Sequence, residues 1–172
     1  TYSATTKSMA AYDPATSAGT KPDFTIQMNV VDSQGGAHTV AVSFLKTANP
    51  NEWAAEMYAV PASDLKTEAG VPAGQIRAGT VTFTTSGALA TPSTFFNAIS
   101  FGPSVTPTPA PTTPPDVEWA TSLGIAGQNL AFDIGTTGGG ILTQLADTST
   151  VKTVGTNGAG VGQVTGVEID DD

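Results

Sequence analysis

The sequence predicts an all-β domain, either a mostly antiparallel β-sandwich or a closed β-barrel, with long loops rich in proline and glycine. Short segments alternate apolar and polar residues, as half-buried strands do. No apolar pattern reaches the length and period of an amphipathic helix, and strands do not alternate with helices along the chain. The 172 residues, with 19 Gly and 12 Pro, suit one core joined by many turns. These observations do not separate two stacked sheets from one closed sheet.

The first element is a hairpin across residues 24–46. Apolar side chains share one face on both sides of its turn: Ile26, Met28 and Val30 before it, and Val40, Val42 and Phe44 after it. Within the turn, Asp32 and Ser33 provide side chains that cap free N–H groups, while Gly35 and Gly36 provide the positive φ angles of a tight reversal. The two strands are therefore expected to pair antiparallel.

Later segments continue the pattern. Further strands are expected at residues 52–60 beside the second strand, around Val81 and Phe83, at 95–101, around Leu130, Phe132 and Ile134, and at 161–169. Residues 62–78 are interrupted by proline, which predicts a surface loop, and residues 135–140 are expected to form a flexible turn. Residues 1–22 are expected to pack as an extended arm with one short strand near 8–12.

Six prolines in residues 103–115 favour polyproline II and exclude a central strand. We predict a stiff surface strap there, with a recognition segment for an aromatic-lined groove as the alternative. The apolar positions of the expected strands define the predicted core: Ile26, Met28, Val30, Val40, Val42, Phe44, Trp53, Val81, Phe83, Leu130, Phe132 and Val167.

Composition excludes several classes of function. The net charge of -9 and the six scattered basic residues argue against a nucleic-acid partner, because phosphate binding depends on clustered Lys and Arg. The absence of cysteine removes disulfides, thiolate metal sites and cysteine nucleophiles. No apolar run reaches the roughly 18 residues that a membrane span needs, so no membrane partner is expected. The chain starts at Thr1 without Met or a signal peptide, which predicts a removed leader or an internal fragment.

His38 is the only histidine, and Asp32 and Ser33 lie close to it in the sequence, as the members of a catalytic triad would. However, a tight turn already gives these residues a structural role, because Asp or Ser caps the turn and His38 begins the next strand. Triads are recognised by a geometry that spacing does not establish. We therefore interpret the three residues as parts of the turn and predict no catalytic residue.

The remaining candidate sites have simpler structural explanations. The glycine-rich residues 135–140 and 155–162 lack the Gly-Lys-Ser/Thr ending and the following helix of a phosphate loop, and Asn157-Gly158 is typical of a hairpin tip. The acidic residues 170–172 could attract calcium, but a solvated chain end explains them. Three carboxylates without a distinguishing motif leave open a pair for glycoside cleavage: Asp116, Glu118 and Asp133. No cofactor and no metal are predicted.

Four segments, in order, resemble the middle β domain of bacterial flagellar hook proteins. The first is Val31-Asp32-Ser33-Gln34-Gly35-Gly36-Ala37-His38, close to that family's Tyr-Asp-Ser-Leu-Gly-Asn-x-His and followed by Asn51-Glu52-Trp53. The second ends in the Phe-x-x-x-Gly-x-Leu of residues 83–89, and the others are residues 142–145 and 157–167. Val31, Gln34 and Gly36 depart from the usual form.

The resemblance implies a non-enzymatic structural subunit of the curved extracellular tube that joins the rotary motor to the filament. It implies other copies of the hook protein as partners, and export by the flagellar secretion apparatus without a cleaved signal peptide. The polymerising helical segments of that family lie at its termini, so we expect the isolated chain to be monomeric. Residues 1–156 are then the main β domain, and residues 157–172 are a final strand that could begin an adjoining inner domain.

A secreted carbohydrate-binding or adhesin-type β module is the alternative function. It is favoured by Tyr58 and Trp119, which we expect to be exposed aromatic residues, and by the threonine-proline strap.

Overall fold

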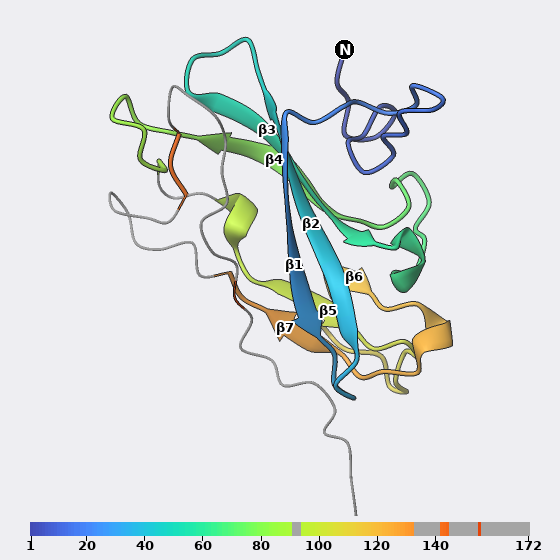
Figure 1. Ribbon diagram of the computed structural model, residues 1–172. Coiled ribbons are helices and arrows are strands. Elements are labelled where there is room, and N and C mark those ends of the chain that lie inside the picture. The colour runs from blue at the N-terminus through green and yellow to red at the C-terminus, as the bar shows by residue number, and fades with distance from the viewer. Residues whose placement is uncertain (91–93, 133–141, 145–154, 156–172) are drawn as a thin grey trace, which may run out of the picture.

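The computed structural model describes residues 1–90, 94–132, 142–144 and 155, which form two β-sheets (Figure 1). The main sheet has the order β1-β2-β3-β4, with every neighbouring pair antiparallel. Its strands are β1 (Phe24–Val31), β2 (Ala37–Lys46), β3 (Glu52–Val60) and β4 (Gln75–Thr82). The predicted all-β, mostly antiparallel fold is confirmed. The arrangement is sandwich-like, and the described strands do not close into a barrel.

The second sheet has the order β6-β5-β7 and consists of short strands. They are β5 (Ile99–Gly102), β6 (Val117–Glu118) and β7 (Gln128–Leu130), with β6 parallel and β7 antiparallel to β5. Three 3₁₀ turns connect the strands: η1 (Ala62–Asp64), η2 (Thr94–Phe96) and η3 (Thr121–Leu123). In the described part of the chain, no helix is long and apolar enough to cross a membrane.

The predicted β1–β2 hairpin is confirmed, with Val31 opposite Ala37 and Phe24 opposite Phe44. Asp32 N–H donates to Gly36 O at 2.8 Å, and Gly35 has the expected positive φ of 83°. Gly36 does not have a positive φ, so that part of the prediction was wrong. Glycine is favoured at position 36 by lack of space, because the Cβ of any other residue would lie 2.6 Å from Asp32 Oδ2.

The third strand pairs with the second as predicted, with Met57 opposite Val42. The predicted surface loop at residues 62–78 is wrong at its end, because β4 begins at Gln75. Small and polar residues such as Arg77 and Gly79 interrupt the alternation of apolar and polar residues by which a strand is recognised. The segment is a strand because it forms hydrogen bonds with β3. Phe83 lies just beyond β4 and makes an isolated bridge to Leu89.

Three other strand predictions were wrong in their bounds or in the presence of a strand. Residues 8–12 contain no strand, although the arm around them has bridges at Ser3–Lys7 and Asp13–Ala18. Residues 95–101 divide into η2 and β5. Around residue 130 the strand ends at Leu130, before Phe132. Ile134, the turn at 135–140 and the strand at 161–169 lie outside the described residues.

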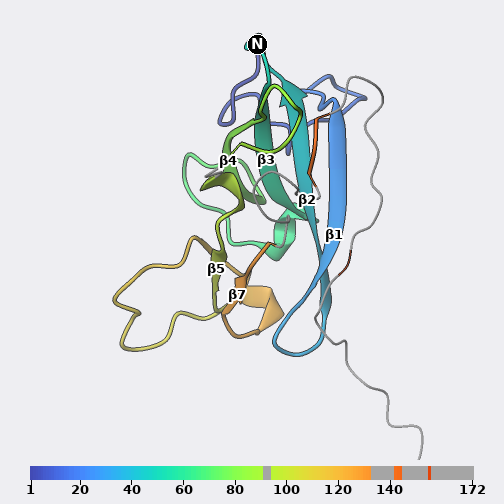
Figure 2. The same ribbon diagram turned by 90° about the vertical axis from the view of Figure 1, so that its left-hand side faces the viewer.

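The strap at residues 103–115 is on the surface, as predicted. Residues 105–114 are all exposed, contain no strand, and project from the body of the molecule as the yellow loop in Figure 2. Its two ends are held by backbone hydrogen bonds of 2.9 Å. Ser104 N–H donates to Ile125 O in the loop before β7, and Asp116 N–H donates to Ser100 O in β5.

One hydrophobic core joins the inner faces of the two sheets. Six of the predicted core residues are buried: Val30, Val40, Val42, Phe44, Val81 and Phe83. Five pack against the core while partly exposed: Ile26, Met28, Trp53, Leu130 and Phe132. Val167 lies outside the described residues. The second sheet adds Ile99, Phe101 and Trp119, which the prediction omitted.

The opposite face of the main sheet is also covered. Ser43 and Glu56, which the alternating pattern assigns to the outer face, are both 0% exposed. Residues 1–22, hereafter the N-terminal arm, lie against this face at one end of the sheet, with Met9 buried in the contact (Figure 1). The main sheet is therefore a central layer. Its inner face packs against the second sheet, and its outer face makes polar contacts with the N-terminal arm.

Met57→Ala should cost about 2–5 kcal/mol of unfolding free energy, because Met57 is fully buried between the sheets. Val60→Ala, at the 38% exposed end of the same strand, should cost less than about 1 kcal/mol. Urea denaturation measures both. Equal losses would contradict the placement of the core.

Candidate functional site

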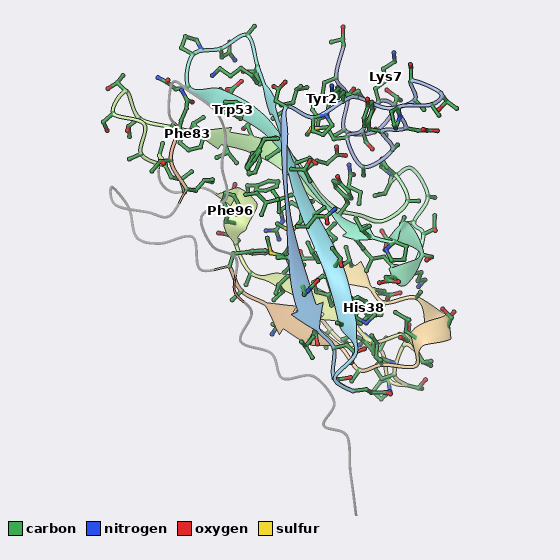
Figure 3. The ribbon with its side chains drawn as sticks, in the orientation of Figure 1. Tyr2, Lys7, His38, Trp53, Phe83 and Phe96 are labelled. Atoms are coloured by element: carbon green, nitrogen blue, oxygen red, sulfur yellow. The ribbon has the colours of Figure 1, made fainter. Side chains whose placement is uncertain are left out.

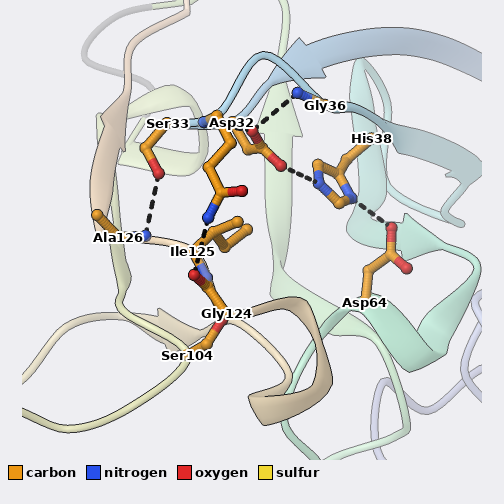
Figure 4. Close-up of polar contacts among 10 residues, drawn as sticks. Asp32, Ser33, Gly36, His38, Asp64, Ser104, Gly124, Ile125 and Ala126 are labelled. Atoms are coloured by element: carbon orange, nitrogen blue, oxygen red, sulfur yellow. Dashed lines mark hydrogen bonds and ion pairs between the residues drawn. The ribbon is translucent and has the colours of Figure 1, made fainter.

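The turn of the β1–β2 hairpin carries a histidine held between two carboxylates (Figure 4). Asp32 Oδ1 accepts the N–H groups of Gln34 at 2.7 Å and Gly36 at 2.8 Å, which closes the turn. Asp32 Oδ2 lies 3.0 Å from His38 Nε2, and Asp64 Oδ2 lies 2.7 Å from His38 Nδ1. The imidazole therefore ties the hairpin to η1, which is distant in sequence.

Aromatic stacking extends this connection into the second sheet. The His38 ring centroid lies 4.8 Å from that of Trp119, and Trp119 stacks on Phe101 at 4.6 Å and 24°. The expectation that Trp119 is exposed was wrong, since the side chain is only 1% exposed. The alternation of Val117 and Trp119 was the available signal of its inward direction. This burial removes one of the two aromatic residues on which the adhesin alternative depended.

The same turn also binds the loop that precedes β7. Ser33 Oγ accepts Ala126 N–H at 3.0 Å, and Gln34 Nε2 donates to Gly124 O at 2.9 Å. Between them, Ile125 N–H donates to Ser104 Oγ at 3.1 Å. We call the set of Asp32, Ser33, Gln34, His38, Asp64 and Trp119 the junction, because it joins the main sheet, η1 and the second sheet.

The junction favours a charged imidazole. Burial by itself lowers the pKa of His38, but hydrogen bonds and charge interactions with Asp64 and Asp32 outweigh it and raise the pKa above its usual 6.5. Burial by itself raises the pKa of Asp32, whereas hydrogen bonds from His38, Gln34 and Gly36 lower it below the usual 3.8. The protonated imidazole can donate to both carboxylates at once.

The triad geometry is absent from this site. Both ring nitrogens of His38 face carboxylates, and Ser33 Oγ bonds to Ala126 N–H instead of the imidazole. A general base needs a free nitrogen within reach of the nucleophile. The interpretation of Asp32 as a turn cap is confirmed, whereas sequence reasoning missed Asp64, for which nothing in the local pattern gave a signal.

The two carboxylate candidates that the structure describes, Asp116 and Glu118, have different basic partners. Asp116 Oδ2 accepts Ser100 N–H at 2.8 Å and lies 3.9 Å from Arg77 Nη2, while Glu118 pairs with Lys66. Asp133 and the acidic end at 170–172 lie outside the described residues, as do the glycines at 135–140 and 156–162. Among the described residues, no group of three or more His, Asp or Glu could hold a metal ion.

A second buried polar cluster lies under the N-terminal arm, and no pattern in the sequence indicates it. Glu56 accepts Met9 N–H and Gln75 Nε2, and Gln75 Nε2 also donates to Ala4 O at 2.8 Å. Burial raises the pKa of Glu56, although these hydrogen bonds oppose the shift. Burial, with the charge of Glu56, also raises the pKa of Tyr2 to about 12.

Residues 1–159 match the sequence model of a protein family that is described as "Flagellar basal body protein FlaE D2 domain". This chain belongs to that family. This match, together with two related flagellar hook proteins, confirms the resemblance to the middle β domain of flagellar hook proteins.

Two flagellar hook proteins align with most of this chain. The flagellar hook protein FlgE of Caulobacter vibrioides is 40% identical over 183 aligned residues, which cover 99% of this chain and 30% of that protein. A solved 32 kDa fragment of the flagellar hook protein FlgE from Caulobacter crescentus is 38% identical, with a TM-score of 0.72, over 88% of this chain and 52% of the fragment. This chain thus spans less than a third of the length of the first relative.

The junction should make stability depend on pH. A raised His38 pKa adds stability that is fully present below 6.5 and is lost as the pH rises through the folded-state pKa. A lowered Asp32 pKa adds stability that is present above 3.8 and is lost as the pH falls through the folded-state pKa. His38→Gln should therefore flatten the decrease in unfolding free energy as the pH rises above 6.5.

Urea denaturation across this pH range tests the prediction, and the absence of any other histidine makes the comparison clean. At about pH 6, His38→Gln should cost roughly 2–4 kcal/mol, because it leaves two carboxylates without their shared cation. An unchanged slope in the variant would show that His38 does not carry this dependence.

Proposed function

We propose that this chain is a structural domain of the bacterial flagellar hook, the curved and flexible joint that transmits motor torque to the filament. The observation that carries the proposal is the alignment of 99% of the chain with a flagellar hook protein at 40% identity. The match of the solved hook fragment at a TM-score of 0.72 supports it at the level of structure. Its partners are other copies of the hook protein, and its location is the extracellular hook.

The chemistry of the described residues supports a structural role without catalysis. The one histidine has both nitrogens engaged by carboxylates, and the most elaborate polar site connects parts of the fold to each other. A net charge of -9 opposes binding to nucleic acid, and we propose no membrane partner. Export by the flagellar apparatus, without a cleaved signal peptide, belongs to the same proposal.

The surface suits contacts that must change as the joint bends. The described residues form a loop-rich surface with a projecting strap and few exposed large apolar side chains, which favours small polar interfaces over an obligate apolar one. Small polar contacts can slide or break at low cost. We assign this role to the outer surface of the chain and place the permanent contacts of the hook elsewhere in the subunit.

We divide the chain into a main β domain at residues 1–156 and a final strand at 157–172. The end of the family match at residue 159 supports this division. Residues 157–172 lie outside the described part of the structure.

Deletion of the gene that encodes this chain should abolish swimming, and electron microscopy should show cells with absent or truncated hooks. Re-expression of the gene from a plasmid should restore both. Normal hooks after deletion would overturn the proposed function, and glycan-array binding by the purified chain would favour the adhesin alternative instead.

The isolated 172-residue chain should sediment as a monomer at micromolar concentration. The reason is that strong polymerising contacts are assigned to segments outside it. Sedimentation velocity over a concentration series measures this, and a stable oligomer would contradict the assignment.

A further inference from the structure

Two segments far apart in sequence bind opposite faces of the same strand, β3. The N-terminal arm binds Glu56, and residues 142–144, hereafter the return segment, bind Trp53. Side chains alternate along a strand, so residues 53 and 56 point to opposite faces while lying only about 10 Å apart. We propose that β3 is the mechanical anchor of this chain, clamped on one face by the N-terminal arm and on the other by the return segment.

On the rear face, the contact is a buried carboxylate that binds main chain. Glu56 is 0% exposed, and it accepts the N–H of Met9, whose side chain is 1% exposed. Gln75, on neighbouring β4, donates both to Glu56 and to Ala4 O. The arm is therefore held at two points along its length. Opening it would break the hydrogen bonds at Met9 N–H and Ala4 O and expose the buried Met9 side chain to water, which is costly.

On the front face, the contact is a side-chain amide that uses both its oxygen and its nitrogen. Trp53 Nε1 donates to Gln144 Oε1 at 2.9 Å, and Gln144 Nε2 donates to Asn51 Oδ1 at 3.2 Å. The backbone N–H of Gln144 donates to Gly87 O at 2.8 Å. Gly87 leaves no room for a side chain, since a Cβ there would lie 2.4 Å from Gln144 O.

Both contacts lie far from the junction. Figure 3 shows Tyr2 and Trp53 toward one end of the main sheet and His38 toward the other. In the proposed hook subunit, on which this inference rests, force that enters along the arm would leave along the return segment through β3 and its two neighbouring strands. The second sheet and the strap would carry little of that force and remain available for changing contacts with other copies.

Single-molecule pulling on the full 172-residue chain tests the anchor. The chain has no cysteine, so Thr1→Cys and Asp172→Cys provide unique attachment points. At constant force, Trp53→Phe should shorten the lifetime of the first rupture about three- to tenfold, because it removes the hydrogen bond to Gln144 and keeps an aromatic ring. Glu56→Ala should shorten it at least as much.

Matched substitutions elsewhere provide the controls. Trp119→Phe makes the same chemical change at a buried indole whose N–H has no partner among the described residues. Gly87→Ala should shorten the lifetime, whereas Gly124→Ala should not, since Gly124 also has a positive φ but no atom lies within 4 Å of where its Cβ would be. Glu52→Ala, on the same strand as Glu56, controls for loss of a carboxylate.

The anchor is tested by comparing, for each variant, the first-rupture lifetime under force with the unfolding free energy in urea. Trp119→Phe and His38→Gln should lower the unfolding free energy in urea and leave the first-rupture lifetime unchanged. If the lifetime follows overall stability in every variant, or if Trp53→Phe and Gly87→Ala have no effect on it, the anchor is refuted. Because this measurement uses the isolated chain, it is independent of whether gene deletion abolishes the hook.

Discussion

The imidazole of His38, held between Asp32 and Asp64, is the interaction on which the arrangement of the two sheets depends. The second sheet has strands of four, two and three residues, too short to be stable without support from the rest of the fold. It is fixed to the main sheet where His38 packs on Trp119 and Trp119 stacks on Phe101. The position of the imidazole is set in turn by two carboxylates from different loops.

The main sheet uses different physical interactions on its two faces. Its inner face is apolar and gains stability from area removed from water. Its outer face buries Ser43 and Glu56, whose polar groups require specific partners. Ser43 meets Thr25 and Tyr58 at 2.7 and 3.0 Å, and Glu56 meets the arm. Apolar packing tolerates small shifts, whereas the polar contacts define one position of the arm.

Local patterning predicted the elements that form from neighbouring residues. The alternation in β1, β2 and β3, and the turn chemistry of Asp32 and Gly35, are enough to indicate the hairpin and the third strand beside it. The register of the strands was not predicted from the sequence. Three of the misses, β4, Asp64 and Glu56, share one cause, which is long-range contact. β4 forms because β3 offers it hydrogen bonds, and Asp64 and Glu56 acquire their roles from partners 26 and 47 residues away. No short window contains that information.

The Asp-Ser-x-Gly-x-x-His segment suggests catalysis, but each of its functional residues can be explained by a structural role in the junction. Asp32 closes the turn and binds the imidazole, Ser33 binds the loop before β7, and Gly35 supplies the positive φ. Gly36, which departs from the usual form of the motif, leaves the space that the Asp32 carboxylate occupies. Each residue is used, and each use connects one part of the fold to another. Both ring nitrogens of His38 and both oxygens of Asp32 are bonded within the fold, so the geometry of this segment supports a role in holding the hairpin, η1 and the second sheet together.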